Sequence, residues 1–346
     1  MAASATSGTR YEPVIGWPLV PHGMSFKEAT SVGVGPDGRV YVFNRGQWPV
    51  MIFDPAGNLL DTWGAGQFVR PHGIAFDGDG NLFLTDVGLH TVQKRTPDGG
   101  LLMEIGTPRM PAPLQSGLPF NQPTQVAVHP RGDLYITDGY GNSAVHHYSG
   151  DGKHLKSWGA PGDGPGQFSL PHAICFIGED QILVADRENF RVQVFTLDGA
   201  FVRQMHMHKP QALFAGRGDD TNIYVAEGRA VPLMEAAMRT GRRVIVLDRD
   251  LNEVLRLGND TGGEAPDQFI SPHGISVDDE GSIYVAEVSY TALGSRLPVP
   301  QEVVSLRKWR RVEGGVTSGA MAASAVPGYL AGVRLDGPGA QPPVAR

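Results

Sequence analysis

A short phrase, a proline followed by a few mostly apolar residues, recurs along the chain and constrains its fold more than any other feature. The prolines that open it are 39 to 62 residues apart, and a degenerate first copy lies at residues 29–34. Each copy leads through a turn into a second strand-like segment that ends in an acidic or polar residue. A repeat of this period is typical of propellers and other repeat folds. The full copies begin at Pro71, Pro123, Pro171, Pro210 and Pro272.

Each unit holds enough sequence for four strands. The third and fourth segments are separated by turns such as Asp151-Gly152 and Asp198-Gly199, and Asp-Gly supplies the positive φ that tight hairpins need. The abundance of turn residues, with 46 Gly and 27 Pro in 346 residues, agrees with many short strands. Helical spacing occurs only at residues 231–238. Four strands in each of six units predict an all-β fold, a six-bladed β-propeller.

The repeat units occupy residues 28–313, which predicts one propeller domain preceded by an N-terminal segment at residues 1–27. Residues 314–346 are rich in Ala, Gly and Pro and lack strand periodicity. They predict a flexible tail or, through residues 329–333, a segment that closes the ring. The Gly-Gln-Phe triplets at residues 66–68 and 166–168 are typical of blades of the NHL-repeat type.

Composition argues against several classes of function. The net charge is −7, and Lys and Arg form no dense block except at residues 307–311, so we expect no binding to nucleic acid. No apolar run reaches the roughly 18 residues of a membrane helix, so we expect no membrane partner. The start of the chain does not read as a signal peptide, and Cys175 is the only cysteine. These features predict a cytoplasmic protein, although a secreted mature chain would look the same.

Three copies of the phrase carry a histidine directly after the proline, and they alternate with copies that do not. His72, His172 and His273 are 100 and 101 residues apart, which corresponds to two units each. In a six-bladed ring, alternate blades lie about 120° apart around the axis, and the first strand of each blade lines the central channel. The sequence therefore predicts that the three imidazoles meet at the axis as a metal-binding tripod.

A tripod of histidines leaves one metal position open for water or substrate, which is the catalytic pattern for zinc. Imidazole also binds other divalent transition metals, so zinc is one candidate among several. The alternative is that each histidine is packed or hydrogen-bonded, as a single Pro-His in an NHL blade usually is. Asp86, Asp138 and Asp186 end second strands, and for them we favour hydrogen bonds to turn amides over a calcium site.

Two longer phrases are more specific than generic NHL sequence. They are Asp-Gly-Tyr-x-Asn-Ser at residues 138–143 and Pro-Gly-Gln-Phe-Ser-x-Pro-His at residues 165–172. Through them, and over about residues 42–287, the chain resembles the peptidyl-α-hydroxyglycine α-amidating lyases. The resemblance implies a six-bladed propeller with a catalytic zinc on His72, His172 and His273. It also implies cleavage of an N-acyl α-hydroxyglycine, peptide-derived or small, to a primary amide and glyoxylate.

The same resemblance assigns roles to three further residues. Arg45, in the phrase Asn-Arg-Gly at residues 44–46, and Tyr140 match active-site residues of the family, and so does Arg187 in the phrase Asp-Arg-Glu-Asn. In the mechanism that we expect, Tyr140 takes the substrate hydroxyl proton after Arg45 or the metal stabilises its phenolate, and Arg187 holds a substrate carboxylate. The alternatives are strand-end packing for Tyr140 and an ion pair between blades for Arg187.

The chain also departs from the family. Gly274 follows the third histidine where the family has an aspartate that helps to bind a structural calcium, so calcium binding lacks that ligand here. Cys175 alone cannot form the family's disulfides. The insertions at residues 228–242 and 290–301 are different and could reshape the channel mouth. A related α-hydroxyamide is therefore a second possible substrate. Two other functions stay open: a metal-dependent hydrolase such as a lactonase, and a non-enzymatic NHL scaffold.

Overall fold

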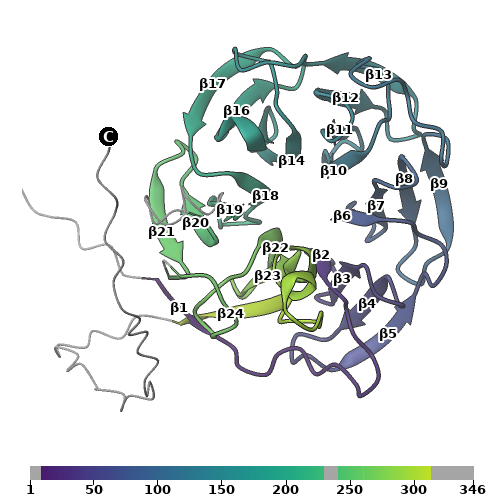
Figure 1. Ribbon diagram of the computed structural model, residues 1–346. Helices are drawn as coiled ribbons and strands as arrows, with labels where there is room; N and C mark the ends of the chain where they lie inside the picture. Colours follow the sequence, from purple (N-terminus) through teal and green to yellow (C-terminus); the bar gives the residue numbers. More distant parts are fainter. Residues whose placement is uncertain (1–8, 230–240, 260, 313–346) are drawn as a thin grey trace, which may run out of the picture.

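The chain forms a ring of six blades around a central axis, as Figure 1 shows. This computed structural model describes residues 9–229, 241–259 and 261–312. Each blade is a four-stranded antiparallel sheet, and the first strand of every blade lies closest to the axis. The all-β, six-bladed propeller expected from the repeat is therefore confirmed. The candidate helix at residues 231–238 and the tail at residues 314–346 lie outside the described residues.

The strands follow one another in chain order within the first five blades. The first blade comprises β2 (Ala29–Val34), β3 (Val40–Asn44), β4 (Val50–Phe53) and β5 (Leu59–Trp63). The second comprises β6 (Pro71–Phe76), β7 (Leu82–Asp86), β8 (Thr91–Arg95) and β9 (Leu101–Ile105). The third comprises β10 (Pro123–Val128), β11 (Leu134–Asp138), β12 (Ala144–Tyr148) and β13 (His154–Trp158).

The remaining blades repeat this order until the last. The fourth blade comprises β14 (Pro171–Ile177), β15 (Gln181–Asp186), β16 (Arg191–Thr196) and β17 (Phe201–His206). The fifth comprises β18 (Pro210–Ala215), β19 (Ile223–Glu227), β20 (Arg243–Leu247) and β21 (Glu253–Leu257). The sixth comprises β22 (Pro272–Val277), β23 (Ile283–Glu287), β24 (Leu306–Val312) and, as its outermost strand, β1 (Arg10–Pro13).

Blade six is thus assembled from both ends of the described chain. β1 pairs antiparallel with β24, from Arg10 opposite Val312 to Pro13 opposite Trp309. The segment expected to precede the propeller therefore supplies one of its strands, and the propeller starts at Arg10. Sequence reading overlooked this strand because four residues are too few to show an alternating pattern. The pairing closes the ring by joining the two ends of the chain.

The hydrophobic core is divided into six parts, each between two neighbouring blades. Between the first and second blades, for example, Tyr41 and Ile52 pack with Ile74 and Leu84. Equivalent clusters fill the other five interfaces, including the one where blade six meets blade one. Burial of each large apolar side chain is worth about 1.5–3 kcal/mol. Because every blade packs on two neighbours, a closed ring leaves no blade face exposed.

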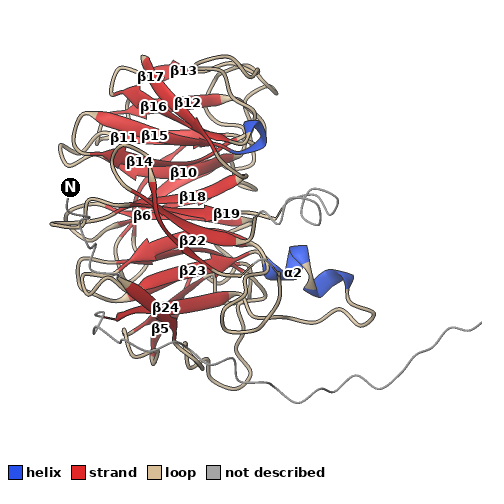
Figure 2. Ribbon diagram, turned by 90° about the vertical axis from the view of Figure 1, so that its left-hand side faces the viewer, coloured by secondary structure: helices blue, strands red, loops and turns tan. Residues whose placement is uncertain are grey.

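Three short helical segments among the described residues lie on one side of the ring. They are η1 (Arg187–Asn189), α2 (Ser289–Ala292) and η2 (Gly294–Arg296). Figure 2 shows these segments on one side of the blades, where second strands end and first strands begin. We call this side the site face. No helix among the described residues is long and apolar enough to cross a bilayer.

Removing residues 1–13 should destabilise the closed ring. The deletion removes the strand that pairs with the outer edge of β24, and it uncovers Trp309, which is only 5% exposed in the intact protein. We expect the Tm, measured by circular dichroism, to fall by about 5 °C or more, since about 1 kcal/mol shifts the Tm of a domain of 150–250 residues by 2–4 °C. A deletion of residues 1–8 retains β1 and serves as the control. An unchanged Tm after the longer deletion would show that β1 does not help to close the ring.

Candidate metal centre and active site

The first strand of every blade has a β-bulge near its start. In β6, Pro71 pairs with Asp86 and Gly73 pairs with Thr85, so His72 has no pairing partner in β7. A bulge bends the strand and re-aims its extra residue, which here lies at the channel. The same register shift falls, in the other five blades, on Thr30, Thr124, His172, Gln211 and His273.

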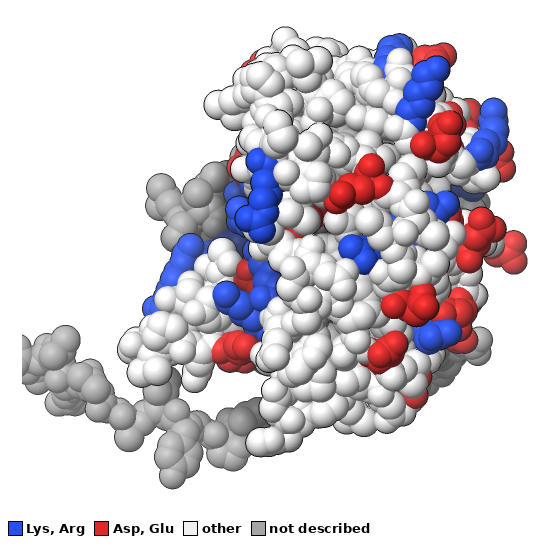
Figure 3. Space-filling model, turned by 90° about the vertical axis from the view of Figure 1, so that its right-hand side faces the viewer, with Lys and Arg blue, Asp and Glu red and all other residues white. Residues whose placement is uncertain are grey.

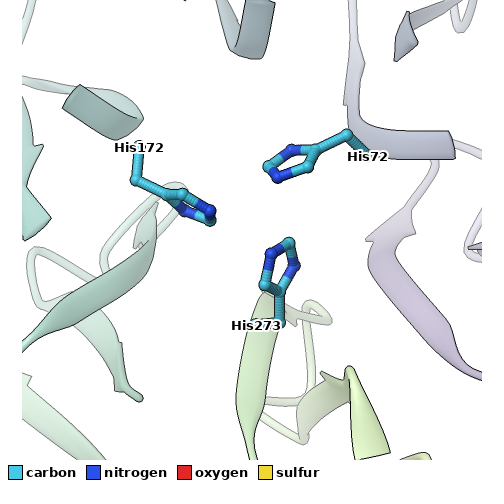
Figure 4. Close-up of side chains that lie close together, drawn as sticks. All are labelled: His72, His172 and His273. Atoms are coloured by element: carbon cyan, nitrogen blue, oxygen red, sulfur yellow. The ribbon is translucent and has the colours of Figure 1, made fainter. Parts of the chain in front are cut away.

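The structure brings His72, His172 and His273 together at the axis, as the alternating phrase predicts. Their ring centroids are 4.7–4.8 Å apart, and one candidate ligand atom from each lies within 4.8 Å of the others. Figure 4 shows the three side chains converging from three separate blades. All three are buried, with 2%, 2% and 6% exposure. This geometry could hold a metal ion.

Each histidine is oriented by a main-chain oxygen of the next blade. Its Nδ1 lies within hydrogen-bond distance of the main-chain carbonyl of the bulged residue in that next blade. Because a carbonyl only accepts, Nδ1 carries the proton and Nε2 carries the lone pair. Outer partners of this kind fix the ring and its tautomer in metal sites. The distances are 2.7 Å from His72 to Thr124, 2.6 Å from His172 to Gln211 and 2.7 Å from His273 to Thr30.

The environment also keeps the imidazoles uncharged. Burial is the main cause that lowers the pKa of His72 and His172 well below the usual value, and it lowers the pKa of His273 to about 3. The positive charge of Arg187 lowers the pKa of all three histidines, and that of Arg45 lowers the pKa of His72 and His273. A neutral imidazole with a free Nε2 lone pair is the form that binds a metal. The chemistry of the three donors therefore fits a divalent transition metal with an open coordination position.

Tyr140 contacts two of the three histidines. Its Oη lies 3.1 Å from Nε2 of His72 and 3.1 Å from Nε2 of His172. Tyr140 follows β11 in a loop that runs close to the chain before His172. A Cβ at Gly139 would lie 2.1 Å from the carbonyl oxygen of Pro171, so the Asp-Gly-Tyr phrase needs glycine there. The phenol hydroxyl therefore lies directly at the tripod.

Arg187 lies beside the phenol of Tyr140. Its Cζ is 5.6 Å from the centre of the Tyr140 ring, a cation–π arrangement, and its Nε donates to Glu188 at 2.9 Å. The guanidinium is thus within the distance at which a cation is attracted to an aromatic ring. Arg187 therefore pairs with its chain neighbour, whereas the alternative interpretation placed it in an ion pair between blades.

Arg45 lies on a different side of the tripod. Its Nη1 donates to Glu28 at 2.6 Å, and its Nε donates to the carbonyl of Pro71 at 3.3 Å. Glu28 is buried and also accepts from the backbone and hydroxyl of Thr291 in α2. The blade-six insertion thus helps to hold Arg45 next to His72. Within the described part of the chain, Arg45 has no recorded contact with Tyr140, so Arg187 is the cation closer to the phenol.

The aspartates at the ends of second strands tether the chain that leads into the tripod. Asp86 accepts hydrogen bonds from the backbone amides of Val69 and Arg70 at 2.7 and 2.9 Å, directly before Pro71. Asp138 and Asp186 hold the equivalent amides in their blades. The interpretation as hydrogen-bonded turn carboxylates is therefore the one that the structure supports. At Gly274, a Cβ would lie 2.6 Å from Cα of Ser31, so neighbouring backbone occupies the space of an aspartate there.

Sequence reasoning missed two charged residues at the site. Glu28 belongs to no motif in the sequence, because only the folded chain brings it into contact with Arg45. Arg70 precedes Pro71 and could have been noticed by that position. Its side chain is exposed, and no other described residue forms a hydrogen bond or ion pair with its guanidinium. Its charge is among those that lower the pKa of His273.

Several basic side chains lie on loops of the site face. Figure 3 shows Lys and Arg on the left, where the site face lies, and also at the upper right, whereas Asp and Glu are more frequent on the right. Arg45, Arg70, Arg187 and Lys209 all belong to loops of this face. The whole chain has a net charge of −7. Glu28 pairs with Arg45, and Glu188 pairs with Arg187 and Lys209.

Comparison with known proteins identifies related chains. The NHL repeat family matches residues 120–148 and 168–195. The chain is 37% identical to peptidyl-alpha-hydroxyglycine alpha-amidating lyase 1 of Drosophila melanogaster over 174 residues, which are 45% of this chain and 31% of the relative. It is 31% identical to peptidyl-glycine alpha-amidating monooxygenase of Mus musculus over 290 residues, 78% of this chain and 29% of the relative. The chain thus spans less than a third of either relative.

Two further matches cover most of both chains. NHL repeat-containing protein 3 of Homo sapiens is 28% identical over 311 residues, which are 85% of this chain and 86% of the relative. The solved structure of a streptogramin B lyase superposes with a TM-score of 0.56 at 12% identity, covering 88% and 98% of the two chains, which shows the shared fold alone. The chain is therefore a six-bladed β-propeller with NHL repeats, and part of it is similar to relatives named peptidyl-alpha-hydroxyglycine alpha-amidating lyase.

Proposed function

We propose that this protein is a metal-dependent lyase that cleaves an N-acyl α-hydroxyglycine to a primary amide and glyoxylate. The observation that carries the proposal is the contact of Tyr140 Oη with Nε2 of both His72 and His172. This contact brings a phenol hydroxyl within hydrogen-bond distance of two nitrogen atoms that would bind a metal. The position of Arg187 beside Tyr140 and the relatives named as lyases support the same conclusion.

His72, His172 and His273 would hold a divalent transition metal, with zinc as the first candidate. When bound, such a metal acts as a Lewis acid and lowers the pKa of a hydroxyl that binds to it. The three carbonyl partners keep the Nε2 lone pairs directed inward without any rearrangement. Tyr140 contacts the tripod from the side of the site face.

Tyr140 would act as the base. It takes the proton of the substrate hydroxyl, the C–O bond becomes the C=O bond of glyoxylate, and the C–N bond breaks with its electron pair leaving on the amide nitrogen. The nitrogen then needs one proton, and the same phenol can return it. The phenolate is present before the hydroxyl proton is taken and again after that proton is returned, and Arg187 would stabilise it from beside the ring. No water is consumed, which distinguishes the reaction from hydrolysis.

The experiment that tests this function uses α-hydroxyhippurate and the protein purified without added metal. Glyoxylate and benzamide should appear in equal amounts, with about one metal ion per chain by elemental analysis. Opening of a lactone without glyoxylate release would instead support the hydrolase. A protein with neither metal nor turnover would support the scaffold.

The substrate carboxylate has two possible partners, and a prediction separates them. Arg187 already donates to Glu188, whereas the guanidinium of Arg70 has no partner among the described residues. We expect Arg70→Gln to raise KM at least tenfold for the free acid and much less for its methyl ester, since a charge-assisted hydrogen bond contributes about 1.5–3 kcal/mol. Arg131→Gln, which changes an exposed arginine on the opposite face of the ring, is the control. If the preference for the free acid over the methyl ester were lost in Arg187→Gln but kept in Arg70→Gln, Arg187 would be the residue that binds the substrate carboxylate.

A further inference from the structure

The loop between β9 and β10 exposes large apolar side chains next to the site. Met110, Leu114 and Leu118 are 69%, 73% and 59% exposed, and Arg109 is the only charged residue in the segment 107–120. In Figure 1 the segment runs between blades two and three. Scattered exposed apolar residues are common, but several on one loop beside a binding site indicate a surface that contacts a ligand.

This loop is attached to the loop that carries Tyr140. The amide of Gln115 donates to the carbonyl of Gly141 at 2.9 Å. The amide of Gly117 donates to Asn142 Oδ1 at 3.2 Å, and Asn142 Nδ2 donates back to the carbonyl of Leu118 at 2.9 Å. Gly141 and Asn142 directly follow Tyr140 in sequence. The exposed apolar side chains are therefore held at a fixed place relative to the phenol.

The loop is also stiff. It contains four prolines, at positions 108, 111, 113 and 119, and each proline fixes its own φ. Ala112 and Phe120 are joined by a backbone hydrogen bond of 2.8 Å, and Asn121 Nδ2 donates to the carbonyl of Ala112 at 2.8 Å. Phe120 anchors the end of the loop with 2% exposure. A surface that is already ordered loses little conformational entropy when a ligand binds.

A fourth exposed apolar side chain, Val69, lies on the segment that leads to His72. The amide of Arg109 donates to the carbonyl of Leu89 at 2.9 Å, which joins the loop to the turn after β7. Val69, 50% exposed, packs on that turn, because its Cγ1 lies 2.5 Å from where a Cβ of Gly88 would be. Val69 comes three residues before His72. We name the surface of Val69, Met110, Leu114 and Leu118 the acyl rim.

We propose that the acyl rim binds the acyl group of the substrate and that this group is hydrophobic, an aliphatic or aromatic chain in place of a polar peptide. The inference rests on the proposed lyase function. With the α-hydroxyglycine end at the tripod and its carboxylate toward the arginines, the acyl end can leave along the rim beside Tyr140. Arg109 is the only charged residue in segment 107–120, and each methylene that the rim removes from water strengthens binding by up to about fourfold.

The test is a chain-length series of N-acyl α-hydroxyglycines from acetyl to octanoyl. We expect kcat/KM to rise by about two- to fourfold per methylene until the rim is covered. The double variant Leu114→Ser, Leu118→Ser should lower the octanoyl-to-acetyl ratio of kcat/KM at least tenfold. Leu101→Ser and Leu155→Ser remove leucines of similar exposure, 53% and 47%, from outer strands and are the matched controls. A ratio that is equal in the wild type and the double variant would overturn the proposal.

A binding measurement separates this inference from the chemistry. N-acetylglycine and N-octanoylglycine lack the hydroxyl and cannot react, so their Kd values can be measured by calorimetry on the metal-loaded protein. Tighter binding of the octanoyl compound, lost in the double variant, would support the rim even if no α-hydroxyglycine were cleaved. Equal Kd values for both compounds would refute it even if lyase activity were found. Loss of self-association in the double variant, without chain-length dependence, would also refute it and assign the surface to a protein contact.

Discussion

Replacing any one of His72, His172 and His273 with alanine should remove most of the bound metal and reduce glyoxylate release to background. Each of the three donors comes from a different blade, and their Nε2 atoms lie around one point at the axis. Two remaining imidazoles form an incomplete site that binds a divalent ion much more weakly. Elemental analysis of each variant, together with the glyoxylate assay, measures both effects.

The control for this result is His206→Ala, which removes an exposed histidine on β17. It should keep both metal and activity. The circular dichroism spectra of the tripod variants should stay those of the folded propeller, because the six inter-blade clusters do not depend on these side chains. If the triple alanine variant kept a full equivalent of metal, the metal site would lie elsewhere on the protein.

Tyr140→Phe should lower kcat by about 10²-fold or more while leaving the metal content unchanged. Removal of the hydroxyl takes away the group that lies 3.1 Å from two Nε2 atoms, but it removes none of the three nitrogen donors. A loss of this size is typical of a positioned acid–base group. Steady-state kinetics and elemental analysis on the same preparation separate a catalytic from a structural role.

Two arginine variants refine this prediction. Arg187→Ala should reduce kcat because the guanidinium lies 5.6 Å from the centre of the Tyr140 ring. Arg45→Ala should reduce it less, since Arg45 contacts Glu28 and Pro71 and has no recorded contact with Tyr140 among the described residues. Glyoxylate release that is indifferent to Tyr140→Phe would rule out the phenol as the base.

The ring and the tripod could be predicted because both follow from repetition. Once Pro71-His72, Pro171-His172 and Pro272-His273 are placed in every second unit, symmetry brings the imidazoles to the axis without any detail of packing. Tyr140, Arg45 and Arg187 came only from the resemblance to a family. Their positions at the site depend on loops, which repetition does not determine.

Other features could not be predicted because they join residues that are distant in sequence. The pairing of β1 with β24 connects Arg10 to Val312 across the whole chain. The contact from Arg45 through Glu28 to Thr291 depends on how the blade-six insertion folds over blade one. The bulges, too, need a partner strand before they exist. These features arise from tertiary pairing, which local patterns in the sequence do not encode.

The carbonyl partners of the histidines make the metal centre a property of the entire ring. Blades two, four and six supply the imidazoles, and blades three, five and one orient them, so all six blades meet in one set of contacts. His273 of blade six is held by Thr30 of blade one, across the seam that β1 closes. A metal bound at the axis would therefore stabilise the interface between blade six and blade one. Ring opening and metal release become one linked equilibrium, in which free metal at 100 times its Kd stabilises the closed ring by about 2.7 kcal/mol.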